Sequence, residues 1–382
     1  MQGDVTITAP AGTALDETFV LSKRFKLEKV TVSGPATLDI GTVEKPQPNL
    51  HALHVRSNGV GSQTIQLHVR YEGPLASPDE KTAVPYTDLI ELCAEQMWVP
   101  LESHVNQLFS IDARISGIPE NMLTVSQGDI EHHGTRLHIH RDMPDVDFAF
   151  VAGRDLKRVS DPGIETYARH IDDPLIQLFR KHAKGATAYF DNLLGPDRAR
   201  PLRIVAVPRV ESEHAYARVA YIVFAEARSA ASGSEPIAER RPAKYVGHEV
   251  AHLWWLRANA QSEDNWLNES LADYSALRYV ESAFGIEERD ALLTKYSAGA
   301  AKPGSILGHG RPSRDAVYSR GPLLLFALDG WIGRARMDRY LRELAQQPVL
   351  TTAVALRILS EVAGPATAAE FEAKLRADAY EG

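Results

Sequence analysis

The segment His248-Glu249-Val250-Ala251-His252 lies within a stretch whose apolar residues repeat at helical spacing. Residues four positions apart on a helix share one face, about one turn apart, so both imidazoles can bind the same ion. The glutamate between them can then reach a water bound to that ion. The alternative is a chance pair of histidines on an ordinary helix. A third ligand nearby would favour the metal site.

A second helical segment downstream offers that ligand. It opens with Asn265-Trp266-Leu267-Asn268-Glu269, in which Asn268 is the expected N-cap and Glu269 lies in the first turn. A carboxylate there also stabilises the start of a helix, and the two interpretations are compatible. Two imidazoles and one carboxylate suit Zn²⁺, with water completing the site. The sequence therefore predicts one zinc ion per chain, bound by His248, His252 and Glu269.

These two segments resemble parts of a known family, the gluzincin zinc metallopeptidases of the aminopeptidase N and leukotriene A4 hydrolase type. His248–Trp255 looks like the family's HExxH helix, and Trp266–Tyr274 looks like its WLNEG segment. Tyr318-Ser319-Arg320-Gly321 is similar to the family's Tyr-Glu-Lys-Gly segment. The resemblance implies a zinc peptidase acting on peptides, in which Glu249 is the general base and Tyr318 assists the transition state.

The periodicity of the chain indicates two domains, as its 382 residues also suggest. Alternating apolar and polar residues, as in Thr64–Tyr71, predict half-buried strands up to about residue 150. Helical stripes dominate afterwards. They include a helix of about twenty residues that ends near Gly195. Further elements are expected as strands at Arg203–Val207 and Arg218–Phe224 and as helices from Pro242 onward.

The fold class that these patterns and the resemblance imply is α+β. A β-rich, saddle-like N-terminal domain is expected over residues 1–150, and a mainly helical, thermolysin-like catalytic domain over residues 151–382. The connection between His252 and Glu269 is slightly shorter than the family's, which a loop between helices tolerates. The chain also stops where the family's large C-terminal helical domain would begin, so a more open cleft is expected.

One departure from the family bears on specificity. In the family, a glutamate on a strand grips the free α-amine of the substrate. The matching position here is Ala215, and Glu211 or Glu213 nearby would have to substitute. The sequence therefore leaves cleavage at the chain end and cleavage within the chain both open. It also leaves open a non-catalytic, zinc-containing peptide-binding relative of these enzymes.

Composition excludes several other classes of function. The net charge is −8, with 50 acidic and 42 basic residues spread along the chain, which argues against a nucleic-acid surface. No stretch is long and apolar enough for a membrane span, and no signal peptide is visible. We therefore expect a soluble protein, either cytoplasmic or exported with its signal already removed.

Two further histidines, His138 and His140, share one strand face but lack an obvious third ligand.

Overall fold

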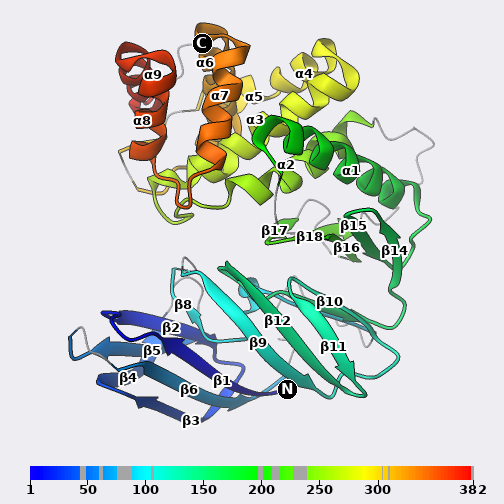
Figure 1. Cartoon of the computed structure of the whole chain (residues 1–382), viewed down its shortest axis with the longest axis vertical. Helices are drawn as coiled ribbons and strands as arrows, with labels where there is room; N and C mark the ends of the chain where they lie inside the picture. Colours follow the sequence, from blue (N-terminus) through cyan, green and yellow to red (C-terminus); the bar gives the residue numbers. More distant parts are fainter. Residues whose placement is uncertain are drawn as a thin grey trace. The chain divides into compact units, whose positions relative to one another are not determined.

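The computed structural model describes residues 1–43, 49–59, 63–74, 88–104, 107–196, 201–208, 215–226, 239–302, 304–308 and 310–379. The chain divides into two compact units, which meet in the sequence between Leu156 and Lys157. Strands make up the N-terminal unit and helices dominate the C-terminal one (Figure 1). The predicted order of a β-rich region and a mainly helical region is therefore confirmed. The expected boundary at residue 150 coincides with the start of strand β13, which belongs to the N-terminal unit.

Four sheets build the N-terminal unit. Their strand orders are β1-β6-β3, β4-β5-β2-β8, β10-β13-β7 and β11-β12-β9, and all neighbours are antiparallel. The predicted strand at Thr64–Tyr71 is β6, and its residues Ile65, Leu67, Val69 and Tyr71 face the core. The strands are β1 Gln2–Ala9, β2 Asp16–Ser22, β3 Lys26–Ser33, β4 Ala36–Val43, β5 Leu50–Ser57, β6 Ile65–Glu72, β7 Leu89–Leu92, β8 Leu101–Glu102, β9 Phe109–Ser116, β10 Leu123–Ser126, β11 Asp129–His133, β12 Arg136–Asp145 and β13 Phe150–Gly153.

The C-terminal unit opens with a five-stranded sheet in the order β14-β15-β16-β18-β17, so that β17 is an edge strand. The strands are β14 Lys157–Asp161, β15 Ile164–Ala168, β16 Leu202–Pro208, β17 Tyr216–Arg218 and β18 Tyr221–Glu226. The parallel pairing of β15 with β16 requires a crossover, and helix α1 (Pro174–Leu194) supplies it. Asp173 caps α1 by accepting a hydrogen bond from the N–H of Leu175. Gly195 ends it at the predicted place.

The predicted single strand at Arg218–Phe224 is wrong. Val219 and Ala220 instead form a two-residue turn between β17 and β18, and Ala220 has a φ of 53°. Glycine or asparagine normally marks such a turn, so an alanine there gives no signal in the sequence.

Helices form the rest of the C-terminal unit. The histidine pair lies on α2 and Glu269 on α3, as predicted, but α3 begins at Trp266 and its N-cap is Asn265. Asn268 is therefore not the N-cap. Its amide group instead forms two hydrogen bonds with the backbone of Ala258, each 3.0 Å long. The helices are α2 Arg240–Trp255, α3 Trp266–Phe284, α4 Ile286–Leu293, α5 Tyr296–Ala300, α6 Gly321–Ile332, α7 Arg334–Ala345, α8 Thr352–Ala363 and α9 Pro365–Arg376.

A π-helical turn, Ala316–Arg320, leads directly into α6. Its last residue, Arg320, is 1 % exposed and donates hydrogen bonds to five backbone carbonyls. Three of these carbonyls lie at or shortly after the end of α5, and two belong to the segment after α9. Arg320 thus joins the last described residues of the chain to the π turn. Its five acceptors are Ala300, Lys302, Gly304, Ala377 and Asp378.

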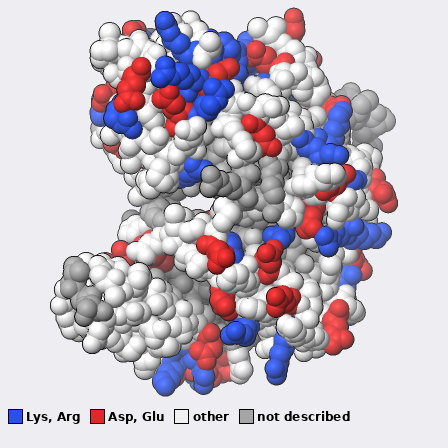
Figure 2. Space-filling model, viewed as in Figure 1, with Lys and Arg blue, Asp and Glu red and all other residues white. Residues whose placement is uncertain are grey.

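Charge is mixed on the surface. On the face that Figure 2 shows, Lys and Arg side chains are interspersed with Asp and Glu side chains. Among the residues that the structure describes, none of the helices has the length and apolar character that crossing a membrane requires.

Candidate metal centre

Close packing of α2 on α3 brings the candidate ligands together. Gly247 faces α3, where a methyl group would lie 3.3 Å from Cδ1 of Tyr279 and 3.4 Å from the Cα of Ala276, so the two helices are in close contact here. Val246, Val250 and Ala251 on α2 are fully buried in the same core. This packing turns the two histidines of α2 toward the first turn of α3.

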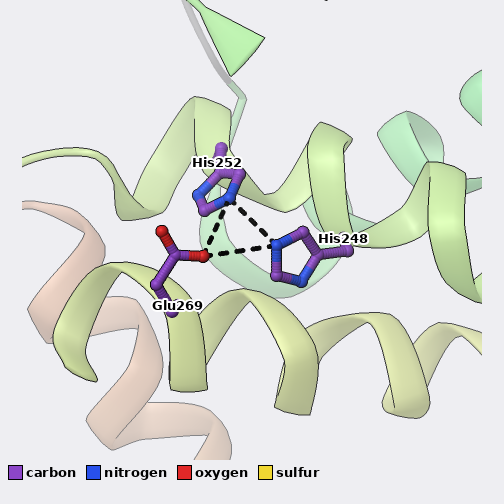
Figure 3. A group of neighbouring side chains, drawn as sticks. All are labelled: His248, His252 and Glu269. Carbon is purple, nitrogen blue, oxygen red and sulfur yellow. Dashed lines mark hydrogen bonds and ion pairs between the residues drawn. The ribbon is translucent and has the colours of Figure 1, made fainter. Parts of the chain in front are cut away.

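The three predicted ligands meet at one point (Figure 3). The Nε2 atoms of His248 and His252 are 3.1 Å apart. Oε2 of Glu269 lies 3.4 Å from the first of these nitrogens and 3.6 Å from the second. Within the described part of the chain, this is the one group of three or more His, Cys, Asp or Glu side chains whose ligand atoms converge closely enough to hold a metal.

The dimensions of this triangle fit zinc. Tetrahedral Zn²⁺ holds imidazole nitrogen and carboxylate oxygen at about 2.0–2.2 Å, which places neighbouring ligand atoms about 3.3–3.6 Å apart. The measured separations fall close to that range. In addition, Oε2 of Glu269 is buried and forms no hydrogen bond with the described residues. Its near neighbours are the two imidazole nitrogens, and a cation held between them and the carboxylate would compensate its buried negative charge.

A buried carboxylate that the sequence did not reveal fixes the orientation of His248. Oδ1 of Asp273 lies 2.6 Å from Nδ1 of His248 and 2.5 Å from Nζ of Lys244, and its other oxygen accepts from the hydroxyl of Tyr296. Because Asp273 needs a donor, Nδ1 of His248 carries the hydrogen and Nε2 is left to bind a metal. The clue in the sequence is the spacing. Lys244 precedes His248 by one turn, and Asp273 follows Glu269 by one turn.

The charges around the site favour a cation at its centre. Burial opposes ionisation of Asp273, but Lys244 and His248 outweigh it and hold the pKa of Asp273 well below its usual value. Burial disfavours the charged form of His248 too, yet Asp273 and Glu269 raise its pKa to about 10. Burial lowers the pKa of His252 to about 4, so this imidazole stays neutral. A positive charge between the three ligand atoms, whether carried by a proton or by a metal, is therefore stabilised.

Glu249 and Tyr318 complete the site. Glu249 is 7 % exposed, and burial raises its pKa to about 7 against the opposing effect of His248. The ring of Tyr318 lies 5.9 Å from that of His248, at an angle of 32°. Burial, and then the charge of Glu269, raise the pKa of Tyr318, so its hydroxyl stays protonated. The site thus holds a carboxylate able to exchange a proton near neutral pH and a hydroxyl able to donate a hydrogen bond.

The predicted substrate-binding residues are a different case. Glu211 and Glu213 lie outside the described residues. Ala215 directly precedes β17 and packs against the core of the C-terminal unit. The strand predicted at Arg218–Phe224 is divided at Val219 and Ala220 into β17 and β18, and Ala215 lies next to β17.

The remaining candidates from the sequence do not join the site. His138 and His140 pair separately with Asp112 and Asp142 on a solvent-facing sheet, and their rings are 6.4 Å apart. Trp254 and Trp255, at the end of α2, are buried in the core of the C-terminal unit.

Comparison with known proteins relates the chain to solved structures. Neither the protein-family models nor the curated proteins gave a match. The M1 zinc metallopeptidase from Deinococcus radiodurans aligns with 100 % of this chain and 91 % of its own, with a TM-score of 0.72 and 16 % identity. The fold is that of the two-domain M1 zinc metallopeptidases. A mutant of the same enzyme bound to a Tyr-Ser-Ala substrate aligns equally far, with a TM-score of 0.70 and 16 % identity.

Native yeast LTA4 hydrolase is also similar. It aligns with 100 % of this chain and 65 % of its own, with a TM-score of 0.72 and 14 % identity. Sequence identities of 14 % and 16 % establish a shared fold but not a shared reaction.

Proposed function

We propose that this protein is a zinc-dependent peptidase, in which His248, His252 and Glu269 bind one zinc ion. The observation that carries the proposal is the convergence of these three ligand atoms, with the buried carboxylate of Glu249 close enough to interact with His248 and Glu269. The M1 neighbour that binds a Tyr-Ser-Ala substrate supports a peptide as the substrate class. When bound, zinc would polarise the carbonyl under attack and make water a better nucleophile at neutral pH.

The residues of the chain would move the protons. Glu249 takes a proton from the attacking water and delivers it to the nitrogen of the leaving amine, a role suited to a carboxyl whose pKa is about 7. The hydroxyl of Tyr318 donates a hydrogen bond to the carbonyl oxygen as negative charge develops there. Asp273 keeps His248 oriented throughout.

Specificity follows from the alanine at position 215. A methyl group offers no partner to a substrate ammonium, and an ammonium desolvated without a partner costs several kcal/mol. We therefore propose that peptides, including those with a blocked N-terminus, are cleaved better than single aminoacyl anilides. Efficient cleavage of anilides that N-acetylation abolishes would contradict this specificity and make Glu211 and Glu213 the next residues to substitute.

The decisive experiment compares metal content with turnover. We expect about one zinc per chain in the wild type and its loss in His248→Ala and Glu269→Ala, measured by elemental mass spectrometry. Glu249→Gln should keep zinc and fold but lose roughly 10²- to 10⁴-fold in kcat, because the amide cannot accept a proton. Cleavage of a mixed peptide library, followed by mass spectrometry, provides the activity measurement.

Glu287→Gln, an exposed carboxylate on α4, is the matched control and should behave like the wild type. Wild-type protein that binds zinc but cleaves no peptide would favour the non-catalytic alternative. Full zinc in both ligand variants would refute the metal site.

A further inference from the structure

The π turn that carries Tyr318 leaves one backbone carbonyl without a helical donor. In an α-helix, the carbonyl of Val317 would accept from the N–H of Gly321, four residues later. Here the N–H of Gly321 donates to the carbonyl of Ala316, five residues earlier. The next possible donor in a π-helix is residue 322, which is a proline and has no N–H.

A side chain on α3, the helix that bears Glu269, supplies the missing hydrogen bond to this carbonyl. The hydroxyl of Ser270, on α3, donates a hydrogen bond of 2.7 Å to the carbonyl of Val317. Ser270 is fully buried. It directly follows Glu269, and Val317 directly precedes Tyr318. One hydrogen bond therefore joins the residue next to a metal ligand to the residue next to the candidate oxyanion donor.

Helices α3 and α6 are in close contact at this point. A methyl group at Gly321 would lie 2.0 Å from Oγ of Ser270, so only glycine fits there. Val317, which accepts the hydrogen bond, and Gly321, where the two helices approach closely, flank Tyr318 in the sequence. Since π turns widen the backbone and redirect the residues within them, the direction of the Tyr318 side chain depends on this turn keeping its form.

We infer that Ser270 is a positioning residue for Tyr318, an inference that rests on the proposed peptidase function. Its hydroxyl donates the hydrogen bond that the carbonyl of Val317 cannot obtain within the π turn. This hydrogen bond fixes the position of the turn relative to α3, the helix that bears Glu269. The phenol of Tyr318 is thereby held at a fixed place relative to the metal ligands. Displacements of about 1 Å in such groups reduce rates by up to ~10²-fold.

The test is a double-mutant cycle of Ser270→Ala and Tyr318→Phe, measured as kcat and KM on an N-terminally blocked peptide. Ser270→Ala should lower kcat by roughly 10- to 100-fold with KM within about two-fold of the wild type. In the Tyr318→Phe background, the same substitution should change kcat by less than about two-fold, because the group it positions is gone. Independent, additive effects of the two substitutions would overturn the inference.

Ser275→Ala is the matched control. Ser275 is another fully buried serine of α3, and its hydroxyl accepts from Nε1 of Trp255. This variant should lower thermal stability but leave kcat unchanged. A loss of kcat equal to that of Ser270→Ala would mean that any buried polar defect in α3 is sufficient, and would overturn the positioning role. If Ser270→Ala does not fold, Ser270→Cys, with a weaker donor of similar size, replaces it in the cycle.

A second readout does not depend on activity. In metal-free protein, Ser270→Ala should speed amide hydrogen exchange in residues 316–321 at least ten-fold, while Ser275→Ala leaves those amides unchanged. Unchanged exchange in Ser270→Ala would overturn the inference by itself. Failure of the wild type to cleave peptides, with the exchange result as expected, would instead refute the proposed function.

Discussion

Asp273 shows how much of the metal site depends on a single buried side chain that binds no metal. It accepts hydrogen bonds from His248, Lys244 and Tyr296 within the core of the C-terminal unit. His248 and Lys244 lie on α2 and Tyr296 lies on α5, so Asp273, on α3, fixes the histidine and links α3 to two other helices. The ammonium of Lys244 compensates the buried negative charge of Asp273.

Asp273→Asn should therefore weaken zinc binding without abolishing it. The amide is a poorer acceptor for Nδ1 of His248, and loss of such a partner typically costs 10- to 100-fold in metal affinity. Competition with a chromophoric chelator measures the dissociation constant.

Asp329→Asn serves as the control, since Asp329 is a buried aspartate that accepts from the hydroxyl of Tyr274, outside the group of metal ligands. Equal zinc affinity in the wild type and Asp273→Asn would show that His248 needs no orienting partner.

At the residue scale, the sequence pointed to His248, His252 and Glu269, which converge in the structure, but not to the side chains that support them. His248, His252 and Glu269 stand at spacings that only a common helix face or a nearby helix start explains. No spacing pattern distinguishes Asp273 and Lys244 from other residues, because aspartate and lysine are common on helix surfaces. Their pairing depends on how α2 and α3 rotate against each other, which the local sequence does not specify.

At the element scale, His182 joins three helices. It lies on α1 and is 1 % exposed. Its Nδ1 is 3.0 Å from the hydroxyl of Tyr279 on α3, and its Nε2 is 3.2 Å from the carboxylate of Glu239, which precedes α2. Burial lowers the pKa of His182, and the neighbouring Glu239 only partly opposes this.

This arrangement predicts that protonation of His182 loosens the packing of α1. Its pKa in the folded state is lower than its usual value of about 6.5, so below that pH the unfolded chain binds more protons. Stability is therefore full above pH ~6.5 and decreases as the pH falls through this range. In urea unfolding between pH 7.5 and 5.5, the wild type should lose stability relative to His182→Gln.

His133→Gln, which removes an exposed histidine of β11, is the control for a general effect of histidine loss. A stability difference between the wild type and His182→Gln that stays constant with pH would contradict the prediction.

Local patterns predicted most elements of this fold, and the exceptions have physical causes. The capping aspartate, proline and terminal glycine of α1 each act within a few residues, so the sequence reveals that helix almost completely. The two exceptions are the turn at Val219 and Ala220 and the π turn at Ala316–Arg320, which accepts a hydrogen bond from Ser270 on α3. Neither has a glycine or asparagine signal that would reveal it beforehand.

At the scale of the whole molecule, zinc should stabilise one unit and not the other. All three ligands come from α2 and α3 of the C-terminal unit. With free zinc at 100 times the dissociation constant, binding stabilises the folded state by about 2.7 kcal/mol. Removing zinc with a chelator should therefore increase hydrogen exchange in the C-terminal unit and leave the sheets of the N-terminal unit unchanged.

His248→Ala is the control, because a chain that cannot bind the metal should not respond to the chelator. A chelator effect of equal size on both units, or on His248→Ala, would contradict this prediction.

The buried guanidinium of Arg320 also sets an order of events during synthesis. Both histidines and Glu269 leave the ribosome well before Ala377 and Asp378, which supply two of the five carbonyls that Arg320 binds. Since Arg320 ends the turn that bears Tyr318, that turn reaches its final form only after residue 378 has emerged. On the proposed function, the three metal ligands would therefore be synthesised before the turn that bears Tyr318 can reach its final form.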